Sequence, residues 1–240
     1  MLKGKRVFVS GGTGHLGSEI CRTCHEHGAE VVFSFHRNEE SARKLQDRLA
    51  GSRSIRMDLR NVKSIEASIG KLYDEVGVIH VLVNNAAISQ IMPLPLIEEE
   101  DVDQIMDINI KGTLFVTKNV VKGMIRNKTG AIVNIGSIAG TRMLDVPVTY
   151  AMTKAAINGF TFALAGELKR FGIRVNSVVP GLLDGGVGQG VPEALRKDFI
   201  DHCAAGRAGR AGEVAELICF LASDRASYIN GQNISVDGGI

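Results

Sequence analysis

Tyr150 and Lys154 are the residues whose types and spacing point most directly to chemistry. Side chains four positions apart share one face of a helix, so the Lys154 ammonium is expected beside the Tyr150 phenol. A nearby cation favours the phenolate and lowers a tyrosine pKa from its reference value of about 10. The phenol then becomes a proton donor or acceptor near neutral pH. If the fold brings Ser137 alongside, its hydroxyl is placed to hydrogen-bond the same carbonyl or alcohol oxygen.

A Tyr-x-x-x-Lys pair also occurs on ordinary helix surfaces, and the N-terminal segment is the first evidence against that interpretation. Residues 5–10 are apolar and β-branched, as in a buried strand, and a helical pattern covers 15–27. A glycine turn between them lets the backbone approach a pyrophosphate, whose charge lies at the helix N-terminus. The predicted dinucleotide-binding residues of this turn are Gly11, Thr13, Gly14, His15, Leu16 and Gly17.

Strand-like and helical segments alternate along the rest of the chain. Strands are expected near 5–10, 30–35, 53–58, 79–84, 130–136, 172–178 and 232–236. Helices are expected near 15–27, 39–50, 62–76, 99–127, 149–170, 192–203 and 211–222. The alternation, without a long polar linker, predicts one α/β domain over 1–240, with a doubly wound parallel sheet and helices on both faces.

The stretch 181–190 is dense in glycine, which is too permissive for a regular element. A slack surface loop is one interpretation. Its position after Pro180 favours the other, a lid over the substrate at about 182–206.

Composition sets the broad class. With 240 residues and 45% hydrophobic content, the chain can bury one substantial core. The formal net charge of +2 is too small to indicate nucleic acid or a membrane surface as partner. Lys3, Lys5 and Arg6 flank a strand rather than an apolar leader, and no apolar run approaches about 18 residues. We therefore expect a soluble, cytoplasmic protein.

Four cysteines, Cys21, Cys24, Cys203 and Cys219, fall in expected helices. Cys21 and Cys24 have the spacing of a redox pair, with His25 and His27 beside them. A redox pair normally lies at a helix N-terminus, where the dipole favours the thiolate, and this one lies inside the first helix. Helix packing is the favoured role, and no metal site is expected.

Together, these motifs resemble the short-chain dehydrogenase/reductase family over essentially all 240 residues. The matching positions, in the family's order, are the glycine turn, Asp58-Leu59, Asn84-Asn85-Ala86-Ala87, Asn109 with Gly112, Ser137, Tyr150, Lys154, Pro180-Gly181 and Val236-Asp237-Gly238-Gly239. The resemblance implies a Rossmann-type, seven-stranded sheet with strand order 3-2-1-4-5-6-7. It also implies a homotetramer built through the helices near 99–127 and 149–170 and the last strand. Five apolar residues there suit either core or interface: Ile105, Ile108, Phe115, Phe160 and Phe162.

The resemblance assigns roles to the four catalytic-type residues. Tyr150 is the general acid in reduction, and Lys154 lowers its pKa and binds the nicotinamide ribose. Ser137 polarises the substrate oxygen. Asn109 helps to hold a water chain behind Lys154.

The resemblance also assigns cofactor contacts. Asp58 lies near the adenine amine with Leu59 against the ring, and Asn84 and Ala86 line the ribose side. Asn85, Pro180 and Gly181 complete the cofactor set.

Two departures from the family pattern are visible. In the glycine turn, Ser10 replaces a threonine and His15 occupies a usual glycine position. After Pro180-Gly181, relatives often place a threonine that contacts the nicotinamide carboxamide. This chain has Leu182-Leu183-Asp184-Gly185 instead.

The end of the second strand bears on the choice of cofactor. NAD sites place a carboxylate there to accept from the ribose 2′-hydroxyl, whereas a 2′-phosphate needs a cation. Glu39 and Glu40 belong to the next helix, and Arg37 offers a guanidinium fork with His36 beside it. The pattern predicts NADP(H). The alternative is that Arg37 is only solvated.

The substrate is the least determined feature. The run 206–215 and the Val-Asp-Gly-Gly ending look most like 3-oxoacyl-thioester reductases, which implies NADPH-dependent reduction of a 3-oxoacyl thioester or similar ketone. Carrier-protein members place basic residues at two surface positions near the site. Lys128 fills one of these and Phe171 the other, with Lys169 and Arg170 adjacent. Apolar pocket candidates are Ile138, Met143, Leu144, Val146, Val148, Leu183 and Val187.

Two alternatives remain at this point. One is an alcohol or cyclic-hydroxyl dehydrogenase of the same family. The other is a non-catalytic dinucleotide-binding protein, which would have no need of a proton donor beside the hydride path.

Overall fold

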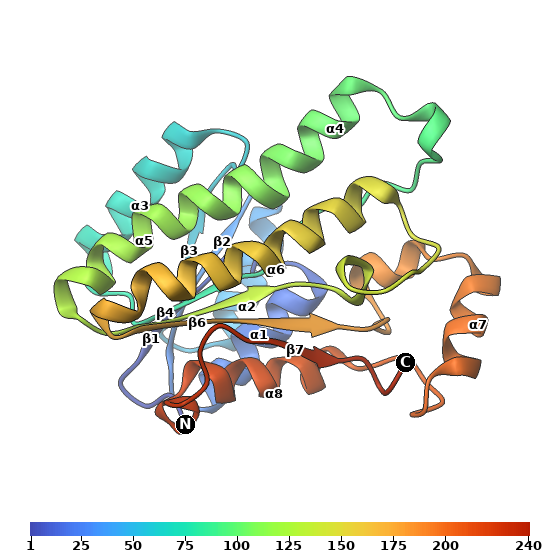
Figure 1. Cartoon of the computed structure of the whole chain (residues 1–240). Coiled ribbons are helices and arrows are strands. Elements are labelled where there is room, and N and C mark those ends of the chain that lie inside the picture. The colour runs from blue at the N-terminus through green and yellow to red at the C-terminus, as the bar shows by residue number, and fades with distance from the viewer.

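The apolar, β-branched segments form one parallel sheet of seven strands in the computed structural model, which describes residues 1–240 (Figure 1). The strands are β1 (Arg6–Val9), β2 (Glu30–Phe35), β3 (Arg53–Arg56), β4 (Val81–Asn84), β5 (Gly130–Ile135), β6 (Ile173–Pro180) and β7 (Asn233–Val236). Their order, β3-β2-β1-β4-β5-β6-β7, is the predicted one. The order reverses between β1 and β4, which opens a crevice at the carboxyl ends of these strands.

Helices cover both faces of the sheet (Figure 1). They are α1 (His15–Glu26), α2 (Glu39–Arg48), α3 (Val62–Val76), α4 (Glu99–Met106), α5 (Thr113–Asn127), α6 (Val148–Leu168), α7 (Glu193–His202) and α8 (Ala211–Ala222). Buried residues of α1, α2 and α8 form a core on one face, and those of α3, α5 and α6 form a second core on the other. The doubly wound architecture is therefore confirmed.

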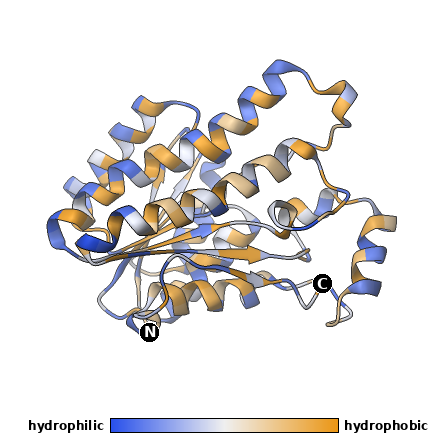
Figure 2. Ribbon diagram, in the orientation of Figure 1, coloured by the Kyte–Doolittle hydropathy of each residue, from blue (hydrophilic) through white to orange (hydrophobic).

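The two cores explain why the strands are apolar at successive positions. In β1, Val7 and Val9 belong to one core, whereas Phe8 between them belongs to the other. Because neighbouring side chains point to opposite faces of a strand, a strand covered on both sides needs apolar residues throughout. Figure 2 shows hydrophobic colour along the strands, interrupted by paler, more polar positions.

Two expected elements differ from the structure. The helix expected over 99–127 is divided by a π-helical segment, η2 (Asp107–Gly112), between α4 and α5. The stretch 181–190 was expected to lack regular structure, and η5 (Gly186–Gly190) forms a short 3₁₀ helix within it. Gly186 has φ +65°, a left-handed conformation in which a side chain is strained.

The cysteines of α1 and α8 pack in the core. Cys21, Cys24 and Cys219 are fully buried, and the Cys24 and Cys219 sulfurs lie 3.5 Å apart. Burial raises the pKa of the Cys21 thiol well above its usual range. The helix-packing role is confirmed. None of the helices combines the length and apolar character that a membrane span requires.

Candidate active site

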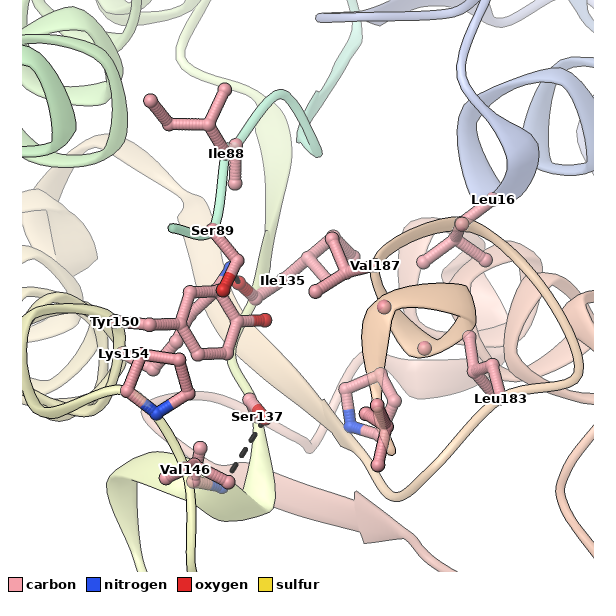
Figure 3. Close-up of a pocket in the computed structure, with 18 of the residues that line it drawn as sticks. Leu16, Ile88, Ser89, Ile135, Ser137, Val146, Tyr150, Lys154, Leu183 and Val187 are labelled. Carbon is pink, nitrogen blue, oxygen red and sulfur yellow. Dashed lines mark hydrogen bonds between the residues drawn. The ribbon is translucent and has the colours of Figure 1, made fainter. Parts of the chain in front are cut away.

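A cavity of about 1170 Å³ lies at the carboxyl edge of the sheet, where the order of the strands reverses. Figure 3 shows side chains entering it from the segments after β4, β5 and β6 and from the start of α1. Most predicted site residues line this one cavity: Gly11, Thr13, Gly14, His15, Leu16, Gly17, His36, Asp58, Leu59, Asn85, Ala86, Ser137, Tyr150, Lys154, Pro180 and Gly181. Three do not: Arg37, Asn84 and Asn109.

Helix α6 presents Tyr150 and Lys154 to the cavity on one face, as their spacing predicts. Lys154 is 4% exposed, and its Nζ donates to the Ile135 carbonyl oxygen over 2.8 Å. The same Nζ lies 5.5 Å from the centroid of the Tyr150 ring. Figure 3 shows Ser137 facing the same space as Tyr150. The structure thus brings the Ser137 hydroxyl, which precedes α6 in the sequence, into one cavity with the Tyr150 phenol and the Lys154 ammonium.

The expected lowering of the Tyr150 pKa is wrong for the free protein. Burial raises the pKa of Tyr150 to about 12, with the Ser137 hydroxyl opposing this rise. Burial also lowers the pKa of Lys154 to about 8. The ammonium is directed to the Ile135 carbonyl rather than to the phenol oxygen, and loss of water around the phenol disfavours the phenolate. In the free protein, Tyr150 is therefore a firmly protonated phenol.

Ser137 is positioned by the short helix η3 (Ile138–Gly140), which follows β5. The Ser137 oxygen accepts from the Ala139 amide over 3.2 Å, so its hydroxyl proton is free to be donated into the cavity. At Gly140, a Cβ would lie 2.5 Å from the Lys154 carbonyl carbon. Glycine at this position lets η3 lie directly on α6, which brings Ser137 close to Tyr150.

Asn109 lies behind the cavity, in the π-helical segment η2, and is 2% exposed. Its side chain accepts from the Ile88 amide and donates to the Ile88 carbonyl, both over 2.9 Å. It also donates to the Thr153 hydroxyl over 3.1 Å. These contacts tie the segment after β4 to α6, and none of them reaches Lys154.

Asn84 was expected to line the cofactor side, but it is not among the residues that line the cavity. Its amide group donates to Thr117 over 2.9 Å and to Asn134 over 2.8 Å inside the protein. The reason is the alternation of the strand, which turns Asn84 into the layer between β4 and α5. Asn85, the next residue, lines the cavity and donates to the carbonyl of Ser10 over 3.0 Å.

The glycine turn fits a bound pyrophosphate. The first turn of α1 has no side-chain cap and no acidic residue, so its free amides can face an anion. At Gly17, a Cβ would lie 2.2 Å from the Gly11 carbonyl oxygen. This glycine is needed for the turn to close, as in dinucleotide-binding folds. Ser10 keeps the turn on β4, because its hydroxyl accepts from the amides of Asn85 and Ala86 over 3.0 and 3.1 Å.

Comparisons with known proteins agree with this geometry. A family model described as enoyl-(acyl carrier protein) reductase matches residues 13–240. The 3-oxoacyl-[acyl-carrier-protein] reductase of Chlamydia muridarum is 36% identical over 100% of this chain and 98% of its own length. That of Escherichia coli K12 is 32% identical over 99% of this chain and 98% of its own length. The chain belongs to the short-chain dehydrogenase/reductase family.

Solved structures place it in the same family. A gluconate 5-dehydrogenase from Burkholderia cenocepacia, in complex with NADP and tartrate, has a TM-score of 0.93 at 30% identity and covers 99% of this chain and 95% of its own. A short-chain dehydrogenase/reductase from Serratia marcescens has a TM-score of 0.92 at 26% identity, covering 99% and 98%. An oxidoreductase acting on CH–OH or C=O groups is therefore supported.

The two departures from the short-chain dehydrogenase/reductase pattern contact one another. His15 Nε2 lies 3.3 Å from the Asp184 carboxylate. A Cβ on Gly185 would lie 2.4 Å from the His15 ring, so glycine is needed for the segment after β6 to rest on the imidazole. His15 and Asp184 thus join the glycine turn to the start of the predicted lid.

Gly185→Ala is expected to lower kcat/KM for the carbonyl substrate about tenfold, since the new methyl pushes the lid segment off the His15 ring. In the double variant His15→Gly/Gly185→Ala, the ring is gone and kcat/KM should recover most of that loss. Steady-state kinetics of wild type, both single variants and the double variant measure the coupling. Additive losses would show that the contact does not position the lid.

The end of the cavity next to β2 and β3 holds a cluster of charges. His36 Nε2 lies 3.5 Å from the Asp58 carboxylate, and Arg60 donates to both Asp58 oxygens. These hydrogen bonds from Arg60 lower the pKa of Asp58 to about 2. Arg37 is exposed and forms no ion pair, whereas Glu39 and Glu40 of α2 are paired within their own helix. The Arg37 guanidinium therefore remains unpaired just after β2, outside the lining of the cavity.

The lid predicted at about 182–206 includes helix α7, but the residues of α7 that line the cavity were not identified from the sequence. Helix α7 lines the cavity with one face, formed by Leu195, Asp198, Phe199 and His202. The spacing i, i+3, i+4, i+7 is the signal that identifies this face. Among the expected apolar pocket residues, all line the cavity except Met143, which is fully exposed.

The expected carrier-protein position is not near the site within one chain. Lys128 ends α5 and precedes β5, whereas Ser137 follows that strand. The length of β5 therefore separates them by about 20 Å. Arg170 packs over the Phe171 ring at the same, amino-terminal end of the sheet.

Proposed function

We propose that the protein reduces a carbonyl, a 3-oxoacyl thioester or similar ketone, to a secondary alcohol with NADPH. The observation that carries this is the meeting of Ser137, Tyr150 and Lys154 in one cavity with the phosphate-binding turn. The names of the curated relatives, 3-oxoacyl-[acyl-carrier-protein] reductases, support the reaction. The NADP complex of the gluconate 5-dehydrogenase supports the cofactor.

A bound nicotinamide supplies the hydride. Tyr150 gives its proton to the carbonyl oxygen as the carbon is reduced, and its raised pKa keeps that proton available. The Ser137 hydroxyl donates a hydrogen bond to the same oxygen and stabilises the charge that develops there. Lys154 holds the nicotinamide ribose, and Asn109 positions the surrounding backbone through Ile88 and Thr153.

The NADP(H) assignment rests on the free guanidinium of Arg37 and on the absence of a carboxylate at the end of β2. Asp58, which lies 3.5 Å from His36, is paired with Arg60. Arg37 is exposed and has room to reach a 2′-phosphate outside the cavity wall.

The pH dependence follows from Tyr150 and Lys154. Lys154, with a pKa lowered to about 8, loses its charge as pH rises through that value, whereas Tyr150, at about 12, stays protonated. We expect kcat/KM for reduction to be level below about pH 8 and to fall above it. Lys154→Arg should move this fall to higher pH, because arginine stays charged. A profile that rises through pH 8 would contradict the role of the lysine cation.

The decisive test is turnover of NADPH with a panel of 3-oxoacyl thioesters and simple ketones, followed by absorbance. The expected result is NADPH oxidation that depends on both the ketone and Tyr150. The reverse assay, NADP⁺ with secondary and cyclic alcohols, distinguishes a dehydrogenase of the same family. No turnover in either direction, with NADPH still bound, would instead indicate a non-catalytic dinucleotide-binding protein.

We also infer that the protein is a homotetramer. Helix α6 is apolar on its outward side, where Met152 and Phe162 are exposed beside small residues. Leu114 of α5 is exposed as well. An exposed face of this kind is typical of a protein interface. Ile105, by contrast, is fully buried in its own chain.

Sedimentation at micromolar concentration is expected to show a tetramer, and Phe162→Asp should yield smaller species. Leu96→Asp removes a similarly exposed apolar residue in η1 (Leu94–Leu96), away from α6, and should leave the tetramer intact. A wild-type monomer would refute the assembly.

A further inference from the structure

We propose that the substrate is an uncharged ketone with apolar substituents, and that the pocket discriminates against carboxylates and phosphates near the reacting carbonyl. This inference rests on the proposed function, because it concerns the groups that surround Tyr150.

The substrate side of the cavity is apolar. Away from the glycine turn, its walls come from the segment after β4 and from the approach to α6, as Figure 3 shows for Ile88 and Val146. The lid adds Val187, which lies between Tyr150 and Leu16 in that view. Leu195 and Phe199 of α7 close the remaining side. An apolar substituent on the ketone can lose its water against these walls without leaving a polar group unpaired.

The charged groups of the rim are acidic. Asp145, just before α6, is exposed and forms no ion pair. Asp198 lies on the cavity face of α7 and has only His202 as a partner, at 3.4 Å. Asp184, at the start of the lid, faces His15. An anion entering beside these carboxylates meets repulsion, which is strongest at low salt.

No arginine is among the cavity-lining residues, and Lys154 is their only lysine. Its Nζ already donates to the Ile135 carbonyl and lies next to Tyr150 rather than at the rim. Sites that bind carboxylates or phosphates usually supply an arginine or lysine partner for them. A substrate carboxylate here would lose water without gaining such a partner, which is costly.

This separates the chain from a structure that it resembles closely. The gluconate 5-dehydrogenase is named for a sugar acid and was solved with tartrate, and both compounds carry carboxylates and several hydroxyls. The apolar walls and acidic rim of this chain predict poor use of such compounds, although the folds superpose with a TM-score of 0.93. The similarity of fold therefore does not imply that the two proteins use the same substrate.

The experiment compares 5-oxohexanoate with its methyl ester, using 2-octanone as a purely apolar ketone. NADPH oxidation is followed at neutral pH and low salt, and kcat/KM is measured for each compound. The ester is expected to exceed the acid by about 30-fold or more, the scale of leaving a buried charge without a partner. The charge is three carbons away from the carbonyl, so its effect on intrinsic reactivity is small.

Variants then test whether the pocket causes the difference. In Asp145→Asn/Asp198→Asn, the ester-to-acid ratio should fall about threefold to fivefold at low salt, since two charges near the anion are gone. Leu195→Arg places a cation on the cavity face of α7, and the ratio should fall about tenfold or more. Asp74→Asn removes one charge from α3, away from the cavity, and should leave the ratio unchanged.

Equal kcat/KM for acid and ester would overturn the inference while leaving the proposed function intact. So would a ratio that is unchanged in both pocket variants, because the preference would then come from the compounds themselves. If Leu195→Arg does not fold, the double asparagine variant decides. No reduction of any ketone by wild type would instead refute the proposed function, and this inference with it.

Discussion

Tyr150→Phe is expected to lower kcat for ketone reduction about 10²–10⁴-fold, the usual weight of general acid catalysis. The variant keeps the ring, which fills its place on α6 over Lys154, and removes only the hydroxyl. The pKa of about 12 keeps the phenol protonated at neutral pH, so the hydroxyl that the variant removes is the one that carries the proton. Stopped-flow measurement of a single turnover would isolate the chemical step.

The controls separate chemistry from folding and binding. NADPH affinity, followed by fluorescence titration, should change little, because the phosphate-binding turn is untouched. Ser137→Ala should also lower kcat. Tyr73→Phe is the matched control: Tyr73 lies away from the cavity and its hydroxyl donates to the Val120 carbonyl, so its loss should leave the rate of proton transfer unchanged. Near-wild-type turnover in Tyr150→Phe would refute the assigned mechanism.

Arg37→Ala is expected to weaken NADPH binding about tenfold to a hundredfold, the scale of a charge-assisted hydrogen bond. NADH lacks the 2′-phosphate, so its affinity should change far less. His36→Asp should shift preference further towards NADH, because a carboxylate accepts from the free 2′-hydroxyl and repels the phosphate. In this structure the new carboxylate would also lie close to Asp58, which His36 now faces at 3.5 Å.

The measurement is kcat/KM with both cofactors at one fixed salt concentration, for wild type and each variant. Arg43→Ala is the matched control, since Arg43 is an exposed cation of α2 that is already paired with Glu39. A wild type that prefers NADH would overturn the NADP(H) assignment. If Arg37→Ala lowers kcat/KM equally with both cofactors, Arg37 contributes to the stability of the fold and not to phosphate binding.

The sequence by itself determined the architecture of this protein. The central strands β1 and β4 are short, mostly apolar runs, and the helices carry the 3.6-residue period, so both were visible from neighbouring residues. The glycine turn and Ser137 follow strands, and Tyr150 and Lys154 lie in the first two turns of α6. Because parallel strands bring their carboxyl ends to one edge, the meeting of these residues in a single cavity followed from the order of the elements.

Properties that depend on contacts between distant residues were decided only by the tertiary structure. The spacing of Tyr150 and Lys154 predicted a lowered tyrosine pKa, but burial by the rest of the cavity raises it. The contact between His15 and Asp184 joins two segments 169 residues apart, so neither departure from the family pattern revealed the other. Lys128 and Ser137 are near in sequence, yet β5 holds them at opposite ends of the sheet, because an extended strand carries its two ends as far apart as the chain allows.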